Sequence, residues 1–221
     1  MDIEFQNHIA ELTRTIGGQY PRPWMTNLTD PVSANVFIVG KNQRNGYETS
    51  RISHSRHLDA LFNRNGESCR GVYDEITNQR PSPTRNNLDR FHYLLESAGV
   101  HQLLETNVIC FSTPMSRHLA QAANHEGASN GSEIFGYLLK YIKPRILIAH
   151  GEGTCKELSK ILNVSFPPLP KAANDVISLT VENMVVYVIP SLAPPKWNSW
   201  QRWADEHLGY VSAEVAKILK R

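Results

Sequence analysis

A polar loop follows one short apolar run in the first quarter of the sequence. Val36–Val39 contains no polar residue, and Gly40 after it permits a tight turn of the backbone. Four residues of the loop carry groups that can do chemistry: Asn42, Gln43, Tyr47 and Glu48. An amide can orient a water molecule and a carboxylate can take its proton, so the loop offers parts of a hydrolytic site. The nucleotide-binding patterns GK[ST] and GxGxxG are missing from it.

A rigid turn, Pro81–Asn87, leads into a predicted helix. Thr84 is the predicted N-cap of that helix. Free N–H groups at a helix N-terminus bind phosphate, and Ser82, Thr84 and Arg85 would add side-chain donors. The alternative interpretation is an ordinary proline-rich helix start without a ligand.

A second stiff segment, Ile189–Trp197, follows the last predicted strand and contains three prolines. With Leu192, Lys196 and Trp197 at its tip, it suits insertion into a DNA groove, where an apolar wedge takes the place of an extruded base. The alternative is a surface loop whose tryptophan packs on the core.

Apolar runs alternate with helix-like stretches along the whole chain. The predicted strands are Val36–Val39, Asn107–Phe111, Ile146–Ala149 and Val185–Ile189. The predicted helices are Asp2–Ile16, one including Leu58–Phe62, one between Thr84 and Gly99, Glu133–Ile142, one from Gly153 to about Leu162, and one from about Trp200 to Leu219. This alternation predicts an α/β fold, a three-layer αβα sandwich with a central, mostly parallel four-stranded sheet. Ligands of such sheets bind beyond the carboxyl ends of the strands.

The 221 residues, 41% of them hydrophobic, are enough for one well-buried domain. We expect a single domain over 1–221, in which 1–34 form an N-terminal helix with a proline-containing lead-in and 198–221 form a C-terminal helix. The balance of 23 Lys and Arg against 21 Asp and Glu neither requires nor excludes a nucleic-acid partner.

Three scattered cysteines without a CxxC pair argue against a zinc site or an iron–sulfur cluster, so no metal and no cofactor is expected. Met1–Glu4 does not resemble the start of a secretory signal, and no apolar run reaches membrane-spanning length. We expect a cytoplasmic protein with reduced thiols, no membrane partner and no obligate protein partner.

The polar segments together resemble the uracil-DNA glycosylase superfamily, from about Asn35 to Trp197. They follow the family's order: Val36–Glu48, Gly71–Tyr73, Pro81–Asn87, Leu103–Val108, His125–Phe135 and Ile189–Ser191. The resemblance implies that Asn42 positions the attacking water, that Tyr73 stacks on the base and that Asn107 reads it.

The expected site, which combines the resemblance with the chemistry of the neighbouring residues, has three parts. The expected catalytic residues are Asn42, Glu48 and Asp74, the two carboxylates both in loops. The expected base-binding residues are Gln43, Tyr47, Tyr73, Asn107 and His150. The expected DNA-binding residues are Ser82, Thr84, Arg85, Ser191, Lys196 and Trp197.

Two departures from the family's pattern bear on the substrate. Ile189 stands where the family has the histidine of its His-Pro-Ser motif, which stabilises negative charge on the departing base. Gln43 replaces the proline that normally follows the acidic or amide residue of the first loop. His150 and His125 are the candidates to replace the missing donor.

The expected function is base excision. The protein would flip a base out of double-stranded or single-stranded DNA and hydrolyse its N-glycosidic bond, leaving an abasic site. The altered loops favour a modified pyrimidine, such as the glucosylated hydroxymethylcytosine of phage DNA that anti-phage members of the superfamily remove. The alternatives are a uracil-excising repair glycosylase, a catalytically silent DNA-binding relative, and an unrelated α/β enzyme acting on free nucleosides or phosphorylated metabolites.

Overall fold

The apolar runs form a five-stranded sheet in a computed structural model that describes residues 2–220. Its strand order is β4-β2-β5-β7-β6. The strands are β2 (Val36–Asn42), β4 (Leu103–Ile109), β5 (Ile146–His150), β6 (Ile177–Val181) and β7 (Met184–Ile189). β5 pairs in parallel with β2 and with β7. The predicted α/β class, with helices flanking a mostly parallel sheet in three layers, is confirmed.

The fifth strand, β6, is missing from the predicted set of four. It pairs antiparallel with β7, and its residues alternate between half-buried and exposed. The alternation of Ile177, Leu179 and Val181 with polar residues is typical of an edge strand covered on one face. A search for continuous apolar runs cannot find such a strand, because the polar residues interrupt the run.

The chain divides into two compact units, each built from three stretches of sequence. Unit 1 consists of residues 1–34, 40–80 and 104–143, and unit 2 of residues 35–39, 81–103 and 144–221.

Unit 1 is mainly helical. Its helices are α1 (Ile3–Leu12), α2 (His54–Leu61), α3 (Cys69–Ile76) and α5 (His125–Ile142), with 3₁₀ turns η1 (Pro31–Ser33), η2 (Ser116–Ala120) and η3 (Ala122–Asn124). A small antiparallel sheet joins β1 (Gln19–Tyr20) to β3 (Tyr47–Glu48). Phe5 of α1 stacks on Trp24 at 5.9 Å between ring centroids, and Trp24 Nε1 donates to Leu61 O at 2.8 Å. These contacts anchor the proline-containing lead-in.

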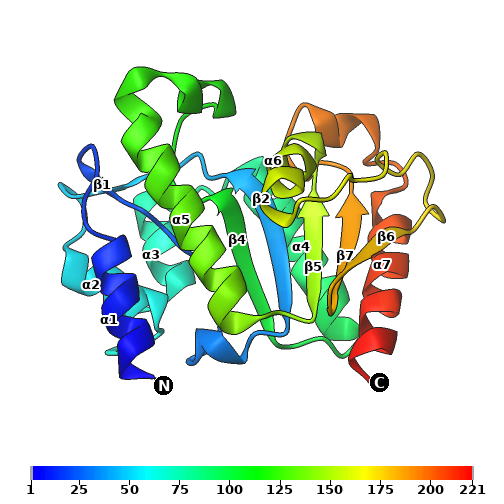
Figure 1. Cartoon of the computed structure of the whole chain (residues 1–221), viewed down its shortest axis with the longest axis horizontal. Helices are drawn as coiled ribbons and strands as arrows, with labels where there is room; N and C mark the ends of the chain where they lie inside the picture. Colours follow the sequence, from blue (N-terminus) through cyan, green and yellow to red (C-terminus); the bar gives the residue numbers. More distant parts are fainter. Residues whose placement is uncertain (1, 221) are drawn as a thin grey trace. The chain divides into compact units, whose positions relative to one another are not determined.

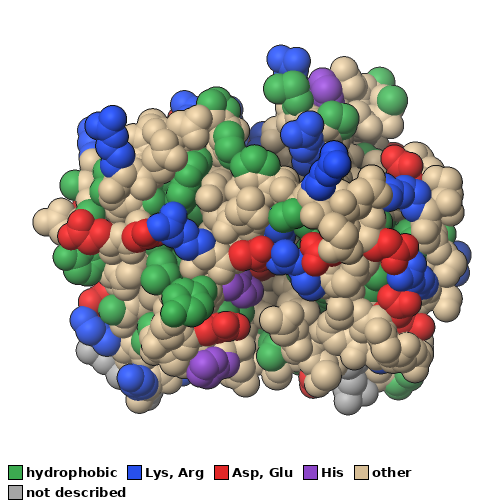
Figure 2. Space-filling model, turned by 180° about the vertical axis from the view of Figure 1, so that it is seen from behind, with side chains coloured by type: hydrophobic (Ala, Val, Ile, Leu, Met, Phe, Trp, Pro, Cys, Tyr) green, Lys and Arg blue, Asp and Glu red, His purple; other side chains and the backbone are tan. Residues whose placement is uncertain are grey.

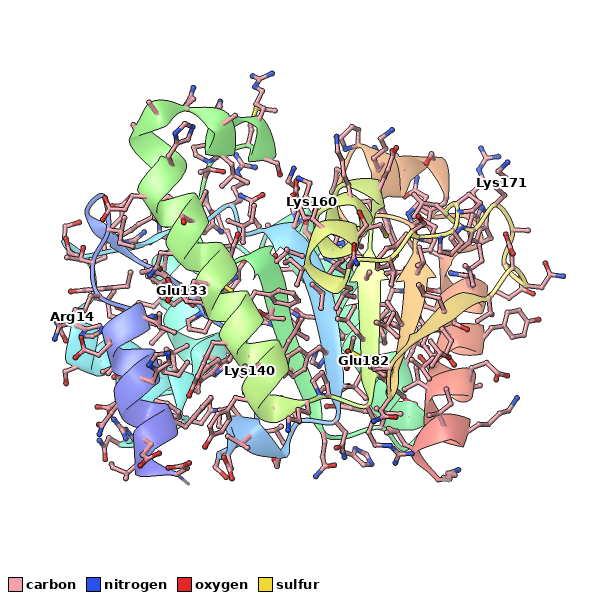
Figure 3. The ribbon with its side chains drawn as sticks, in the orientation of Figure 1. Arg14, Glu133, Lys140, Lys160, Lys171 and Glu182 are labelled. Carbon is pink, nitrogen blue, oxygen red and sulfur yellow. The ribbon has the colours of Figure 1, made fainter. Side chains whose placement is uncertain are left out.

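Helix α5 begins eight residues before its predicted start at Glu133. Gly127 and Gly131 are buried within it, and two glycines in the first turns hide the helical pattern. Glu133 and Lys140 mark its exposed side (Figure 3). The helix ends where Lys143 takes a left-handed conformation, immediately before Pro144.

Unit 2 contains α4 (Pro83–Ser97), α6 (Glu152–Leu162), α7 (Ala204–Leu219) and the 3₁₀ turn η4 (Lys196–Ser199). Its strands β5, β7 and β6 run side by side (Figure 1). Helices α4 and α7 pack on each other, and Phe91 and Leu95 of α4 share a core with Leu208 and Val211 of α7. Gly99, with a φ of +89°, follows α4 as predicted.

Charged side chains of both signs are interspersed on the face drawn in Figure 2, where blue and red groups alternate. Among the described residues, none of the helices is both long enough and apolar enough to cross a bilayer.

Candidate active site

The side chain of Asn42 lies at the carboxyl end of β2 and is held by the segment after β4. Its Nδ2 donates to Thr113 Oγ1 at 2.9 Å, and its Oδ1 accepts from Ser116 Oγ at 2.6 Å. The Thr113 amide also donates to Gln43 O at 3.1 Å. These bonds fix the orientation of the half-buried Asn42 amide. An oriented amide can position a water molecule, but it cannot take the water's proton.

Gln43 and Asn107 form a hydrogen-bonded pair of amides. Asn107 Nδ2 donates to Gln43 Oε1 at 2.9 Å, and Gln43 Nε2 lies 3.5 Å from Arg22 O. Gln43 is only 6% exposed, whereas Asn107 is half-buried. Among the described residues, none donates to Asn107 Oδ1. The pair thus offers a carbonyl acceptor beside amide N–H groups, which is the combination that the edge of a pyrimidine requires.

Tyr47 and Tyr73 lie close to Arg22 inside unit 1. The guanidinium carbon of Arg22 is 5.5 Å from the Tyr47 ring centroid and 5.8 Å from that of Tyr73, within cation–π distance. The two tyrosines are 2% and 4% exposed. A base could stack on either ring only after the groups that cover it had moved.

An open pocket of about 300 Å³ lies beside the loop that follows β2. Its lining is Gly17, Gly18, Gln19, Arg44, Gly46, Glu48, Ser50, Ser112 and Pro114. Arg44 and Glu48 are exposed there and supply one charge of each sign. Gln19 Nε2 donates to Ser112 O at 3.1 Å, which joins two walls of the pocket. This polar hollow suits a ligand with several hydroxyl groups.

Neither of the two expected carboxylates stands in a loop, so that prediction is wrong: Glu48 lies on β3 and Asp74 on α3. Ser68 caps α3 by accepting a hydrogen bond from Gly71 N at 3.0 Å. Asp74 Oδ2 instead accepts from Arg70 Nε at 2.9 Å, one turn earlier on the same helix. We therefore withdraw Asp74 as the group that takes the proton of the water. Gly71 inside the helix explains why the sequence pattern missed it.

Ser82 is the N-cap of α4, which corrects the prediction of Thr84. Its Oγ accepts from Arg85 N at 3.1 Å, Pro83 is the first helical residue, and Thr84 lies in the first turn. The Arg85 side chain is only 6% exposed and donates to Asp89 Oδ1 at 2.8 Å. Arg85 is therefore a buried, paired cation, and the expectation that it offers its guanidinium to DNA is wrong.

His150 is the register partner of Ile189 on the neighbouring strand. Ile189 is fully buried, so the position of the family's histidine is part of the core of unit 2. His150 lies half-buried at the carboxyl end of β5. The other candidate donor, His125, is exposed at the start of α5 with its Nε2 3.0 Å from Ala120 O. The structure thus brings His150 next to the position of the missing histidine.

The segment after β7 was predicted to insert Leu192 and Trp197 into a DNA groove, and this prediction is wrong for both side chains. Leu192 is fully buried and Trp197 is 7% exposed, its ring edge-on to Trp200 at 4.8 Å between centroids. Trp200 Nε1 donates to Ser191 O at 2.9 Å, which holds the segment against the core. Ser191 is half-buried, and Lys196 is exposed at the start of η4. Lys196 therefore remains a predicted DNA contact, whereas Trp197 does not.

The cysteines are buried free thiols in the structure. Burial raises the pKa of Cys69, Cys110 and Cys155 to about 11 each, so none is a reactive thiolate at neutral pH. Among the residues from 2 to 220, no three His, Cys, Asp or Glu side chains are grouped in a way that could hold a metal ion.

No protein-family model matches the chain, and no curated protein is similar to it at a significant level. The resemblance to the glycosylase superfamily therefore depends on the order and types of the residues described above.

Sequence reasoning missed three residues that the structure adds to this region: Arg22, Thr113 and Ser116. Thr113 and Ser116 follow a strand, so the rule that ligands bind beyond carboxyl ends could have found them. Arg22 stands between Pro21 and Pro23, outside every predicted strand and two residues after the short β1, and a single cation between two prolines carries no recognisable signal.

Proposed function

We propose that this protein is a DNA N-glycosylase that binds a flipped-out pyrimidine and hydrolyses its glycosidic bond. The observation that carries the proposal is the Gln43–Asn107 amide pair, whose Asn107 Oδ1 accepts no hydrogen bond from a described residue. Two linked amides of this kind suit the donors and acceptors of a base edge.

The reaction needs a water molecule, a group that takes its proton and donors for the departing base. The transition state carries positive charge on the sugar, as in glycoside hydrolysis. In this proposal Asn42 positions the water and Glu48 takes its proton. Glu48 lines the open pocket, which supports its role over that of Asp74.

A modified pyrimidine is the substrate we favour over uracil. Support comes from the pocket of about 300 Å³ with polar walls, which the loop after β2 helps to form. Such a hollow suits a sugar attached to the base, as in glucosylated hydroxymethylcytosine. Action on phage DNA in the cytoplasm, without an obligate protein partner, belongs to the same proposal.

The test is an abasic-site assay on duplexes that carry uracil, hydroxymethylcytosine or glucosylated hydroxymethylcytosine. We expect abasic sites in the glucosylated duplex and a loss of at least about 100-fold in rate for Glu48→Gln. Glu133→Gln, on the exposed side of α5, is the matched control and should keep the full rate. Abasic sites in the uracil duplex alone would exclude the modified substrate. The absence of abasic sites from every duplex would exclude the proposed glycosylase activity.

A catalytically silent DNA-binding relative is the second candidate. Two observations favour it: Thr113 and Ser116 occupy both ends of the Asn42 amide, and Ile189 leaves no donor at the position of the family's histidine. This candidate predicts DNA binding that Glu48→Gln leaves unchanged, without release of any base.

A further inference from the structure

Arg22 is a half-buried residue whose guanidinium has no carboxylate partner among the described residues. No described carboxylate lies within ion-pair distance of the guanidinium, and its Nη1 atom is buried and makes no hydrogen bond there. Burial acts to lower the pKa of Arg22, but the neighbouring Tyr47, Tyr73 and Glu105 outweigh it and leave the pKa raised, so the charge is retained. Retaining a charged group with a buried N–H that makes no hydrogen bond lowers the stability of a protein.

A second buried polar atom, the hydroxyl of Tyr47, lies next to Arg22 and makes no hydrogen bond of ordinary geometry to a described residue. It interacts with the guanidinium of Arg22, which also lies over the Tyr47 ring. His57 packs edge-on against Tyr47 at 5.2 Å between ring centroids. Burial lowers the pKa of His57 to about 3, so it is neutral, and its Nε2 donates to Pro21 O at 2.9 Å. Arg22 is therefore the cation of this cluster.

The main chain of Arg22 ties the cluster to the proposed base-reading pair. Its amide donates to Cys110 O at 3.2 Å, three residues beyond Asn107, and its carbonyl lies 3.5 Å from Gln43 Nε2. A displacement of Gln43, or of the strand β4 that carries Asn107, would therefore also displace Arg22. Both buried polar atoms are shielded from solvent, so a ligand reaches them only when a covering side chain moves. Tyr47 lies on β3, which is held to β1 by only two residue pairs.

We propose that Arg22, assisted by the hydroxyl of Tyr47, binds the negative charge that develops on the departing base and thereby replaces the histidine that this chain lacks. The inference rests on the proposed function and names the electrophilic residue of its site. The ligand group is a pyrimidine carbonyl oxygen, which accepts a hydrogen bond more strongly as the base becomes anionic.

The reaction balances with water as the only co-reactant. The bond between C1′ and the base nitrogen breaks, and its electron pair stays with the base. The water oxygen bonds to C1′, and the water's proton passes to Glu48 and then to solvent. The base anion held by Arg22 takes up a proton as it leaves.

A structural role and a catalytic role of Arg22 predict opposite changes in stability. If the cation–π contacts held unit 1 together, Arg22→Met would lower the melting temperature. If Arg22 is kept for the leaving base, removing a guanidinium whose Nη1 atom is buried without a hydrogen bond should leave the melting temperature unchanged or raise it.

The experiment compares the full-length protein with Arg22→Met, Arg22→Lys and Tyr47→Phe, and Arg14→Met is the control. Arg14 is an exposed arginine just after α1, with a side chain that is 70% exposed (Figure 3). Three quantities are measured: the melting temperature, the affinity for a duplex with an abasic site, and the single-turnover rate of base release from the panel of duplexes.

For Arg22→Met we expect an equal or higher melting temperature, unchanged affinity for the abasic duplex, and a rate of base release lower by about 100-fold. Arg22→Lys should recover part of the rate, Tyr47→Phe should lose less than Arg22→Met, and Arg14→Met should match the unaltered protein. A lower melting temperature for Arg22→Met overturns the inference, because Arg22 would then be structural. An unchanged rate of base release in that variant also overturns it and leaves the proposed function standing. If the unaltered protein releases no base, the proposed function is wrong, and the inferred role of Arg22 is then wrong as well.

Discussion

Gln43 connects the residues on which the proposed site depends. Its side chain accepts from Asn107, and its backbone carbonyl accepts from the Thr113 amide. Gln43→Leu leaves the Asn107 amide with no partner for its N–H groups. We expect the free energy of unfolding to fall by about 1–3 kcal/mol and base release to slow by about 10- to 100-fold.

Denaturant unfolding and a single-turnover rate test this prediction together. The matched control is Gln201→Leu, since Gln201 is exposed and lies in a turn before α7. The control should change neither quantity. An unaltered rate in Gln43→Leu would contradict the assignment of the amide pair to base reading.

His57 makes stability depend on pH. Burial lowers its pKa to about 3 in the folded protein, far below the value of an exposed histidine. Between about pH 6.5 and pH 3 the unfolded chain binds a proton at His57 that the folded protein does not. The free energy of unfolding should therefore fall as the pH is lowered, with a slope approaching about 1.4 kcal/mol per pH unit from this group.

His54 and His207 act in the same direction, since burial lowers the pKa of each. Urea unfolding from pH 7 to pH 4 measures the slope. His57→Gln should flatten it, whereas His101→Gln, at an exposed position, should leave it as it is. A slope that stays unchanged in His57→Gln would show that His57 is protonated in the folded protein.

Asn42 and Gln43 were predicted as site residues because they follow a strand, and Asn107 because of the family resemblance. The structure brings the three residues together within unit 1, with Asn107 inside β4. The sequence-based prediction failed where burial decides the role of a side chain. Arg85 and Trp197 are the polar and aromatic types that bind DNA, yet tertiary packing turned one into a buried ion pair and the other into core.

At the scale of elements, α5 packs directly on the backbone that leads from Asn107 to Thr113. Gly131 makes this possible: a Cβ there would lie 2.8 Å from Cys110 N, closer than real contacts. The Cys110 amide also donates to Gly131 O at 3.1 Å. We expect Gly131→Ala to lower the free energy of unfolding by about 1–3 kcal/mol and to slow base release, because the segment that holds Asn42 must shift.

Gly136→Ala is the control on the same helix. A Cβ at Gly136 meets no atom within 4 Å, so this change should raise the free energy of unfolding by about 0.5–1 kcal/mol through helix propensity. Thermal melts of both variants check the pair. Equal stabilisation by the two substitutions would contradict the close packing of α5.

The strands β2, β5 and β7 were predictable, because each contains a continuous apolar run. The strand β4 spans Leu103–Ile109 and not Asn107–Phe111 as predicted, because Glu105 and Thr106 interrupt its apolar residues. The helix α3 and the strand β6 were not predicted. A central glycine lowers the helix propensity of α3, and alternating polar residues interrupt the apolar run of β6 at the edge of the sheet. The observed helix ends differ from the predicted ones for local reasons. Ser82, and not Thr84, caps α4, because Pro83 suits the first helical position.

At the scale of the whole molecule, the small net charge of +2 limits how DNA can bind. A protein without a large basic surplus makes few phosphate contacts, so the logarithm of its affinity should fall with the logarithm of the salt concentration with a slope of about −2 to −4. Binding to a labelled duplex from 50 to 300 mM salt measures this slope. Affinity without salt dependence, and equal for mononucleotides, would favour an enzyme that acts on free nucleosides.

The central claim is that the protein breaks the bond between base and sugar with water. The most direct measurement is mass spectrometry of a glucosylated hydroxymethylcytosine duplex incubated with the protein in ¹⁸O-labelled water. We predict the release of the intact modified base and one ¹⁸O atom in the abasic sugar. DNA that keeps every base, or that loses only the glucose from it, would contradict the account.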